Sequence, residues 1–276
     1  MTNASYAEAS AGSMRLFDLR DTSRTSEQSA ESCPFSDLDD RRLIVHPEAD
    51  PVFVEQYRHL GTALHHAQLK DGIRSLLVTS AVGSEGKTLC ATNLALMLSR
   101  SFKRRVLLVD GDLRKPSVHQ LLQIENGAGV TDILKRPGGR VPAHTLPPSL
   151  SVITAGHHDP DPVSLLASDA AGRFLSEARD DFDWVVVDTP PVVLFPDAEL
   201  VADRLDTCVM VVSATTTTPQ VAARAVAAIG ASRTLGVVLN RAQPTEVAAG
   251  YGYGQYGYPQ GNGGRRHRAW WNSSRG

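Results

Sequence analysis

The sequence contains little cysteine and few aromatic residues, and it lacks any long apolar run. Its three cysteines, Cys33, Cys90 and Cys208, are odd in number and share no spacing typical of metal ligands, which argues for a reducing cytosol and against a disulfide framework. No apolar stretch approaches the roughly 18 residues of a membrane span, and the N-terminus lacks a charged segment followed by an apolar one. We therefore expect a cytoplasmic protein that reaches a membrane only through a partner.

The sequence also lacks an excess of charge of either sign. Its 28 Lys and Arg residues nearly balance 30 Asp and Glu residues, for a net charge of −2, so bulk charge gives no reason to expect nucleic acid as a partner. With 276 residues, 42% of them hydrophobic, the chain can bury one sizeable α/β core and still carry tails. We expect a polar, disordered N-terminal arm over 1–41, a folded domain over 42–243 and a flexible tail over 244–276.

The middle part alternates short apolar runs with helical patterns such as Lys87–Arg100 and Asp161–Asp180. Near-continuous apolar runs are typical of strands that are buried on both faces of a parallel sheet. The alternation predicts a doubly wound, mostly parallel α/β fold flanked by helices, with a ligand site beyond the carboxyl ends of the strands. The predicted strands are Ser75–Ala81, Arg105–Asp112, Leu150–Gly156, Asp183–Pro190, Thr207–Ala214 and Leu235–Ala242.

The first strand leads into "SAVGSEGKT", which has the pattern of a phosphate-binding loop. Glycines let backbone N–H groups face phosphates, Lys87 can neutralise the β- and γ-phosphates of ATP, and Thr88 can ligate Mg²⁺. Ala81 stands where the full motif has its first glycine, so a chance "GKT" on a strand-to-helix turn is the alternative; the flanking strand and helix favour the phosphate loop. The predicted nucleotide contacts here are Gly83, Ser84, Glu85, Gly86, Lys87, Thr88 and Leu89.

Carboxylates follow two further strands. Asp110 and Asp112 end "LLVDGD", and Asp188 ends "VVVD". A carboxylate after an apolar strand is costly unless it meets a cation or a donor, and Mg²⁺ on a nucleotide is a suitable cation. Any one of these residues could instead cap the next helix, but the three together with the "GKT" favour a site. At the end of the last strand, Asn240 could hydrogen-bond an adenine or could simply form a turn.

These motifs, in this order, resemble the bacterial tyrosine kinases, the cytoplasmic autokinases of capsule and exopolysaccharide export. The resemblance rests on "TSAVGSEGKT", "VLLVDGDLRKPSVH", "FDWVVVDTPPV" and "GVVLNR" and covers roughly 42–242. It implies a P-loop NTPase fold and ATP-dependent tyrosine phosphorylation. It also implies that Lys87, Asp110, Asp112 and Asp188 carry the chemistry, that Thr88, Asp112 and Asp188 hold Mg²⁺, and that Arg114, Asn240 and Arg241 contact the nucleotide. Whether Asp110 or Asp112 acts as the base stays open.

The resemblance further implies partners. A separate membrane protein of the chain-length-determinant type would dock its cytoplasmic tail on the sheet, a tyrosine phosphatase would reverse the modification, and the kinase would form a homo-oligomer. The family's oligomerisation helix has the pattern Glu-x-x-Arg-x-x-Arg, and here Glu55 and Arg58 are followed by Gly61 in place of the second arginine. The loop also reads "GSEGK" where the family usually has "PGEGK".

The tail contains four of the six tyrosines, within "YGYGQYGYPQ". Glycine, glutamine and proline separate them, so they form no apolar face at helical or strand spacing. A flexible segment of this kind suits a substrate, so we predict that Tyr251, Tyr253, Tyr256 and Tyr258 are the phosphoacceptors. The family resemblance implies that they are modified in trans.

Two other functions fit parts of the sequence. A regulatory ATPase of the MinD/ParA type would hydrolyse ATP without phosphorylating protein, although Val82 stands where those ATPases carry their signature lysine. The tail, followed by "RRHR", could alternatively stack on nucleic-acid bases or associate with itself.

Overall fold

The computed structural model describes residues 40–136 and 141–242. The chain separates into two units, Met1–Arg241 and Ala242–Gly276, and the described helices and strands all belong to the first. The tyrosine cluster and nearly all of the predicted N-terminal arm lie outside the described residues, so their predicted roles stay predictions.

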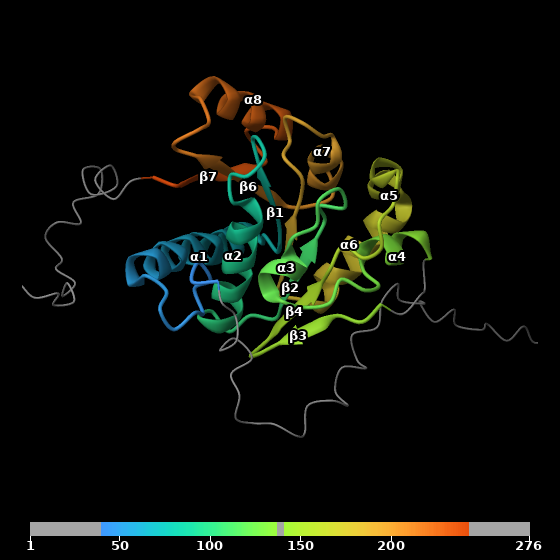
Figure 1. Ribbon diagram of the computed structural model, residues 1–276, viewed down its shortest axis with the longest axis horizontal. Coiled ribbons are helices and arrows are strands. Elements are labelled where there is room, and N and C mark those ends of the chain that lie inside the picture. Colours follow the sequence, from blue (N-terminus) through green and yellow to red (C-terminus); the bar gives the residue numbers. More distant parts are fainter. Residues whose placement is uncertain (1–39, 137–140, 243–276) are drawn as a thin grey trace, which may run out of the picture. The chain divides into compact units, whose positions relative to one another are not determined.

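The described part of the chain forms a seven-stranded sheet in the order β3-β4-β2-β5-β1-β6-β7 (Figure 1). Six strands are parallel, and β3 pairs with β4 in the antiparallel direction at one edge. This order confirms the predicted doubly wound, mostly parallel sheet. The strands are β1 (Ser75–Ser80), β2 (Val106–Asp110), β3 (His144–Leu146), β4 (Leu150–Ile153), β5 (Trp184–Asp188), β6 (Thr207–Ser213) and β7 (Thr234–Asn240).

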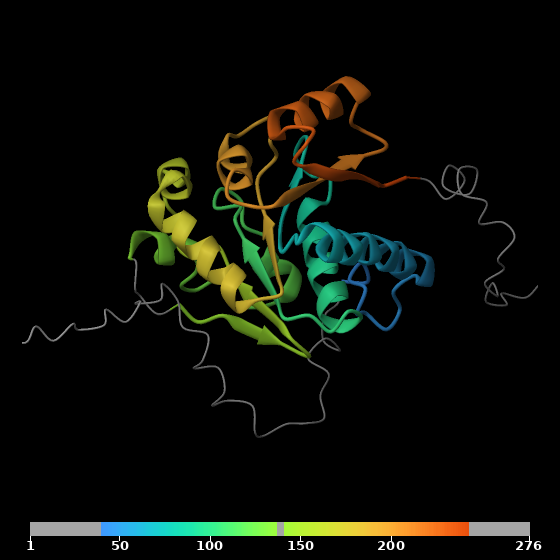
Figure 2. The same cartoon turned by 180° about the vertical axis from the view of Figure 1, so that it is seen from behind.

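Two groups of helices cover the two faces of the sheet (Figures 1 and 2). Alternate residues of each central strand point to opposite faces: Leu77 packs in the core with α4 to α8, whereas Leu76 and Val78 pack in the core with α1 to α3. The helices are α1 (Pro51–Asp71), α2 (Lys87–Arg100), α3 (Val118–Leu122), α4 (Val130–Lys135), α5 (Pro162–Ala167), α6 (Asp169–Asp181), α7 (Asp197–Ala202) and α8 (Pro219–Ile229).

The observed elements correct two expectations. The helix expected over Asp161–Asp180 is two helices, because Ser168 has extended backbone (φ −67°, ψ 157°) and its side chain caps the first turn of α6. The expectation that all six predicted strands are buried on both faces is wrong for β7. At this edge of the sheet, three apolar side chains are exposed: Leu235, Val237 and Leu239.

Helix α1 explains the glycine at position 61. Gly61 is buried, and a Cβ atom there would lie 2.7 Å from Cε2 of Phe102 and 3.1 Å from Cγ of Met97. A larger side chain would therefore push Phe102 away, so position 61 serves packing within the domain. Glu55 and Arg58 form an exposed ion pair with 2.9 Å between Oε2 and Nε. Among the described helices, none is long and apolar enough to cross a membrane.

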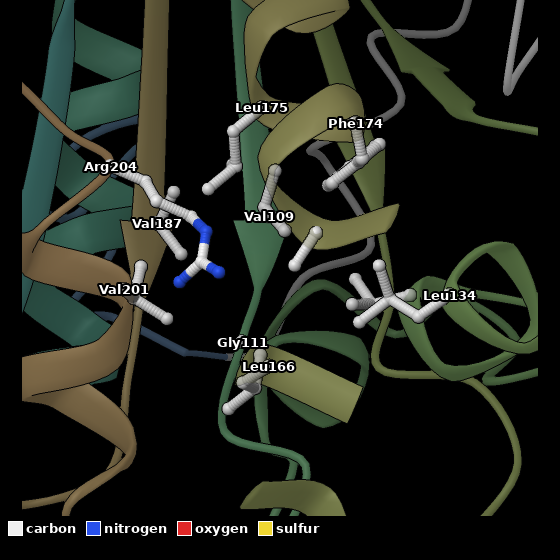
Figure 3. Close-up of a pocket in the computed structure, with 11 residues that line it drawn as sticks. Val109, Gly111, Leu134, Leu166, Phe174, Leu175, Val187, Val201 and Arg204 are labelled. Atoms are coloured by element: carbon white, nitrogen blue, oxygen red, sulfur yellow. The ribbon is translucent and has the colours of Figure 1, made fainter. Parts of the chain in front are cut away.

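A small apolar cavity of about 20 Å³ lies between the sheet and helices α4 to α7 (Figure 3). The guanidinium of Arg204 lies beside it and donates to the carbonyl oxygens of Leu200, Ala167 and Ser168. A volume of this size holds about one water molecule, so the cavity is a packing void and not a ligand pocket.

Candidate nucleotide site

The loop between β1 and α2 lies beside the carboxyl ends of the strands that carry the predicted acidic residues. Strand β5 lies between β1 and β2, which places Asp188 directly beside Asp110 in the sheet register. Strand order therefore brings together the loop lysine and carboxylates that are up to 101 residues away in the chain. This convergence agrees with the site predicted at the carboxyl ends of the strands.

Lys87 and Thr88 contact two of the three predicted carboxylates. Nζ of Lys87 lies 2.8 Å from Oδ2 of Asp112 and 3.8 Å from Oδ2 of Asp188. The hydroxyl of Thr88 donates to Oδ2 of Asp188 at 2.7 Å and accepts from the hydroxyl of Ser117 at 3.0 Å. Burial lowers the pKa of Lys87, but the nearby Asp188 and Asp112 outweigh this effect and raise it, so the lysine stays charged.

Asp110 has a different environment from Asp112. Its Oδ2 accepts from the backbone N–H groups of Ser117 and Val118, at 3.1 and 3.0 Å, and its Oδ1 accepts from the N–H of Asp112 at 3.3 Å. Burial raises the pKa of Asp110 and the charge of Asp188 raises it further, whereas the N–H of Val118 lowers it. Asp110 therefore holds the backbone that follows β2. Asp112 also holds this backbone, since its Oδ1 accepts from the N–H of Lys115 at 2.9 Å, but its Oδ2 is directed toward Lys87.

Asp188 contains the atom that best indicates a cation site. Its Oδ1 is buried and has no hydrogen-bond partner, and burial raises the pKa of this carboxyl to about 6. A buried orphan carboxylate oxygen is costly unless a cation or donor meets it. Among the described residues no three His, Cys, Asp or Glu side chains form a metal cluster. The carboxylate of Asp188 beside the hydroxyl of Thr88 fits Mg²⁺, which in nucleotide sites binds one or two carboxylates together with the phosphates.

The opposite side of the loop is held by the end of β7. The amide of Asn240 donates to the carbonyl oxygen of Glu85 at 2.7 Å and accepts from the N–H of Arg241. Arg241 has a left-handed backbone (φ 59°), and its guanidinium donates to the carbonyl oxygen of Ser84 at 2.7 Å. Both residues contact the loop backbone in this structure, and their contact with a nucleotide stays a prediction.

Arg114 binds Asp197, a residue that was not predicted as part of the site. Its guanidinium forms two hydrogen bonds, of 2.9 and 3.1 Å, with the fully buried carboxylate of Asp197 and lies 4.5 Å above the ring centre of Phe195. Asp197 begins α7, so in the sequence it looks like an ordinary first-turn acid. Ser117 was missed for the same reason, since a serine before a helix indicates only a cap. The nucleotide contact of Arg114 stays a prediction.

Comparisons with known proteins identify relatives of this chain. The family model described as "ParA: NUBPL iron-transfer P-loop NTPase" matches residues 73–245. Tyrosine-protein kinase YwqD of Bacillus subtilis (strain 168) is 34% identical over 221 residues, which are 79% of this chain and 92% of that protein. Putative tyrosine-protein kinase CapB of Staphylococcus aureus is 28% identical over 215 residues, which are 76% of this chain and 93% of that protein.

Solved structures extend the comparison. The kinase domain of Escherichia coli tyrosine kinase ETK has a TM-score of 0.66 at 28% identity, covering 80% of this chain and 87% of that one. The septum site-determining protein MinD of Pyrococcus horikoshii OT3, solved with Mg-ADP, has a TM-score of 0.52 at 17% identity, which shows the shared fold alone.

Fold and loop together define a P-loop NTPase, a class whose members bind nucleotides. Within that class, the chain belongs to the bacterial tyrosine-protein kinase family. The resemblance inferred from the sequence motifs is thereby confirmed.

Proposed function

We propose that this protein is an ATP- and Mg²⁺-dependent autokinase that transfers the γ-phosphoryl group of ATP to its own tyrosines. The observation that carries the proposal is the contact of Lys87 with Asp112 and Asp188 at the strand ends, beside Thr88. A lysine, a hydroxyl and a buried orphan carboxylate oxygen in this arrangement are what MgATP requires from a phosphate loop. When bound, Mg²⁺ supplies neutralising charge for the phosphates.

The remaining steps of phosphoryl transfer are carried out by residues of this chain. The tyrosine oxygen bonds to the γ-phosphorus as the bond from phosphorus to the ADP oxygen breaks, and the hydroxyl proton passes to a carboxylate. We assign that carboxylate to Asp112, because both oxygens of Asp110 accept backbone N–H groups whereas Oδ2 of Asp112 faces the lysine. Thr88 and Asp188 then form the side of the site that holds Mg²⁺.

The base assignment is tested by comparing Asp112→Asn with Asp110→Asn. We expect Asp112→Asn to keep the melting temperature, because Asn can still accept the N–H of Lys115, and to lose tyrosine labelling, because an amide cannot take the hydroxyl proton. Asp110→Asn should lower the melting temperature as well, since an amide NH₂ would face a backbone N–H. Near-normal labelling by Asp112→Asn would show that the base lies elsewhere.

The proposed acceptors are Tyr251, Tyr253, Tyr256 and Tyr258. The first lies ten residues after Arg241 at the carboxyl edge of the sheet, so an extended chain spans at most about 35 Å and can enter a neighbour's site in an oligomer. Each phosphate adds up to about two negative charges, so a fully modified tail is repelled from a nucleotide-filled acidic site. Modification should therefore loosen the oligomer in a graded way.

The family resemblance supports a role in regulating the polymerisation and export of exopolysaccharide or capsule. We propose that the cytoplasmic tail of a separate chain-length-determinant-type membrane protein activates the kinase and recruits it to the inner face of the membrane, and that a tyrosine phosphatase resets it. Adding that tail to the purified kinase should raise the labelling rate. Unchanged labelling would count against this partner.

Incubation with γ-labelled ATP tests the central proposal. We expect label on tyrosine in the wild type, no label in Lys87→Met, and strongly reduced label when all four tail tyrosines are replaced by Phe. The matched control is Tyr57→Phe, since Tyr57 is buried in α1 and should not accept phosphate. Label that persists at the wild-type level in the fourfold variant would remove the tail as substrate.

The match to the ParA model favours one alternative, a regulatory ATPase without kinase activity. The same incubation separates the two functions, because an ATPase releases labelled phosphate to solution and leaves the protein unlabelled.

A further inference from the structure

The nucleotide loop contains a buried carboxylate that the proposed mechanism does not use. Glu85 is 1% exposed although it lies in the middle of the loop, directly before Gly86 and Lys87. Its Oε2 accepts from the N–H of Val82 at 2.7 Å. Its side chain thus points into the protein, where a contact with phosphate is not available to it.

The other carboxylate oxygen of Glu85 joins the loop to a distant segment. Oε1 accepts from the N–H of Ser213, the last residue of β6, at 2.8 Å and from the hydroxyl of Thr217, just before α8. These partners lie 128 and 132 residues further along the chain. One carboxylate therefore connects the start of the loop, the end of β6 and the turn into α8.

The backbone around Glu85 is held from the other side by β7. Asn240 and Arg241 bind the carbonyl oxygens of Glu85 and Ser84, respectively. Ser84 has φ +64°, a left-handed conformation that a residue with a Cβ adopts only when its surroundings impose it. The shape of the loop is thus imposed by the ends of β6 and β7 as well as by its own glycines.

We propose that Glu85 is a positioning residue for nucleotide binding, acting through Ser213 and Thr217. By holding the loop in one shape before the nucleotide arrives, it keeps the loop N–H groups directed at the phosphates, so little ordering is needed on binding. The connection between β6 and α8 thereby belongs to the site. The inference rests on the proposed function only in taking the ligand to be a nucleotide with Mg²⁺.

Calorimetric titration of the full chain with MgADP tests this role. We expect Glu85→Ala to raise the Kd at least about tenfold, Glu85→Gln to have an intermediate effect because it retains one acceptor oxygen, and Thr217→Val to raise the Kd about threefold. The matched control is Thr216→Val, which makes the same change at an exposed position of the same turn and should leave the Kd unchanged.

Melting temperatures separate positioning from mere folding. A Glu85→Ala variant that melts lower but binds MgADP with the wild-type Kd overturns the proposal. If Glu85→Ala does not fold, the comparison of Thr217→Val with Thr216→Val tests the proposal instead. Equal Kd values for these two variants overturn the proposal. The readout is also independent of kinase activity: a Kd that responds as expected in a protein that labels no tyrosine supports the positioning role while contradicting the autokinase.

Discussion

The two sides of the nucleotide loop differ in how well their polar atoms are satisfied. On the side of β2 and β5, Asp112 and Asp188 contact Lys87, Asp110 lies beside Asp188, and Oδ1 of Asp188 has no partner. On the side of β6 and β7, both oxygens of Glu85 accept hydrogen bonds. We call the first the reactive side and the second the bracing side.

This difference indicates a division of roles. Carboxylates that are buried beside each other are unfavourable unless a ligand or cation compensates their charge. Their presence on the reactive side therefore indicates a functional site. A side whose donors and acceptors are already paired gains nothing from a ligand and serves to keep the loop in place. Substitutions on the two sides should therefore differ in kind as well as in size.

The largest effect is expected from Lys87→Met on the reactive side. Removing a charged contact to phosphate should weaken MgATP binding by about 100-fold, corresponding to about 2.7 kcal/mol, and abolish tyrosine labelling. Calorimetry with MgATP and the labelling assay measure both. Nucleotide binding at wild-type affinity would contradict the assignment of the phosphate loop.

Asp188→Asn should separate stability from activity. Burial raises the pKa of Asp188 from an ordinary value near 3.8 to about 6, so the folded state binds the proton more tightly than the unfolded state, and this carboxyl costs stability as the pH rises from about 4 through 6. The variant lacks that cost. We expect the nucleotide-free variant to melt higher than the wild type at pH 8, and the gap to shrink toward pH 4.

The same variant should lose tyrosine labelling by about 100-fold or more, because the cation side of the site has lost its charge. Thermal melts across pH 4–8, with and without MgADP, provide the comparison. A variant that is less stable than the wild type at pH 8 would show that the pairing with Lys87 outweighs the cost of burial.

Gly86→Ala tests the bracing side at the loop backbone. Gly86 has φ +92°, and a Cβ there would lie 2.3 Å from Nδ2 of Asn240, so the loop must shift. We expect the Kd for MgADP to rise about tenfold. Adding Asn240→Ala should restore affinity only in part, because the positive φ remains unfavourable for alanine.

The smallest effect is expected from Asn240→Ala alone. It removes one hydrogen bond, from Nδ2 to the carbonyl oxygen of Glu85, which corresponds to about 1 kcal/mol or a fewfold change in the Kd. Titrating the variant with MgADP and, separately, with MgGDP compares an adenine with a guanine nucleotide. A loss confined to the adenine nucleotide would show that Asn240 reads the base as well as bracing the loop.

Local sequence pattern predicted much of the fold. The apolar runs located six of the strands, and helix α2 spans the predicted residues, Lys87–Arg100. Patterns failed where burial depends on neighbours. Strand β7 is as apolar as the central strands, yet it lies at an edge of the sheet, and Leu235, Val237 and Leu239, which share one of its faces, are exposed. The short antiparallel strand β3 carries no clear signal of its own.

The sequence by itself determined the chemistry of the site: the loop "GSEGKT", the strand-end carboxylates and the order of motifs that marks the kinase family. Only the tertiary structure decided which carboxylate faces Lys87, that Asp110 instead holds the backbone after β2, that Arg114 pairs with Asp197, and that Glu85 points inward to β6. The physical reason is that strand order and side-chain direction decide which groups meet. Glu85 and Ser213 are 128 residues apart, Arg114 and Asp197 are 83 apart, and even the contact of Asp110 with Ser117, seven residues on, depends on the path of the chain after β2.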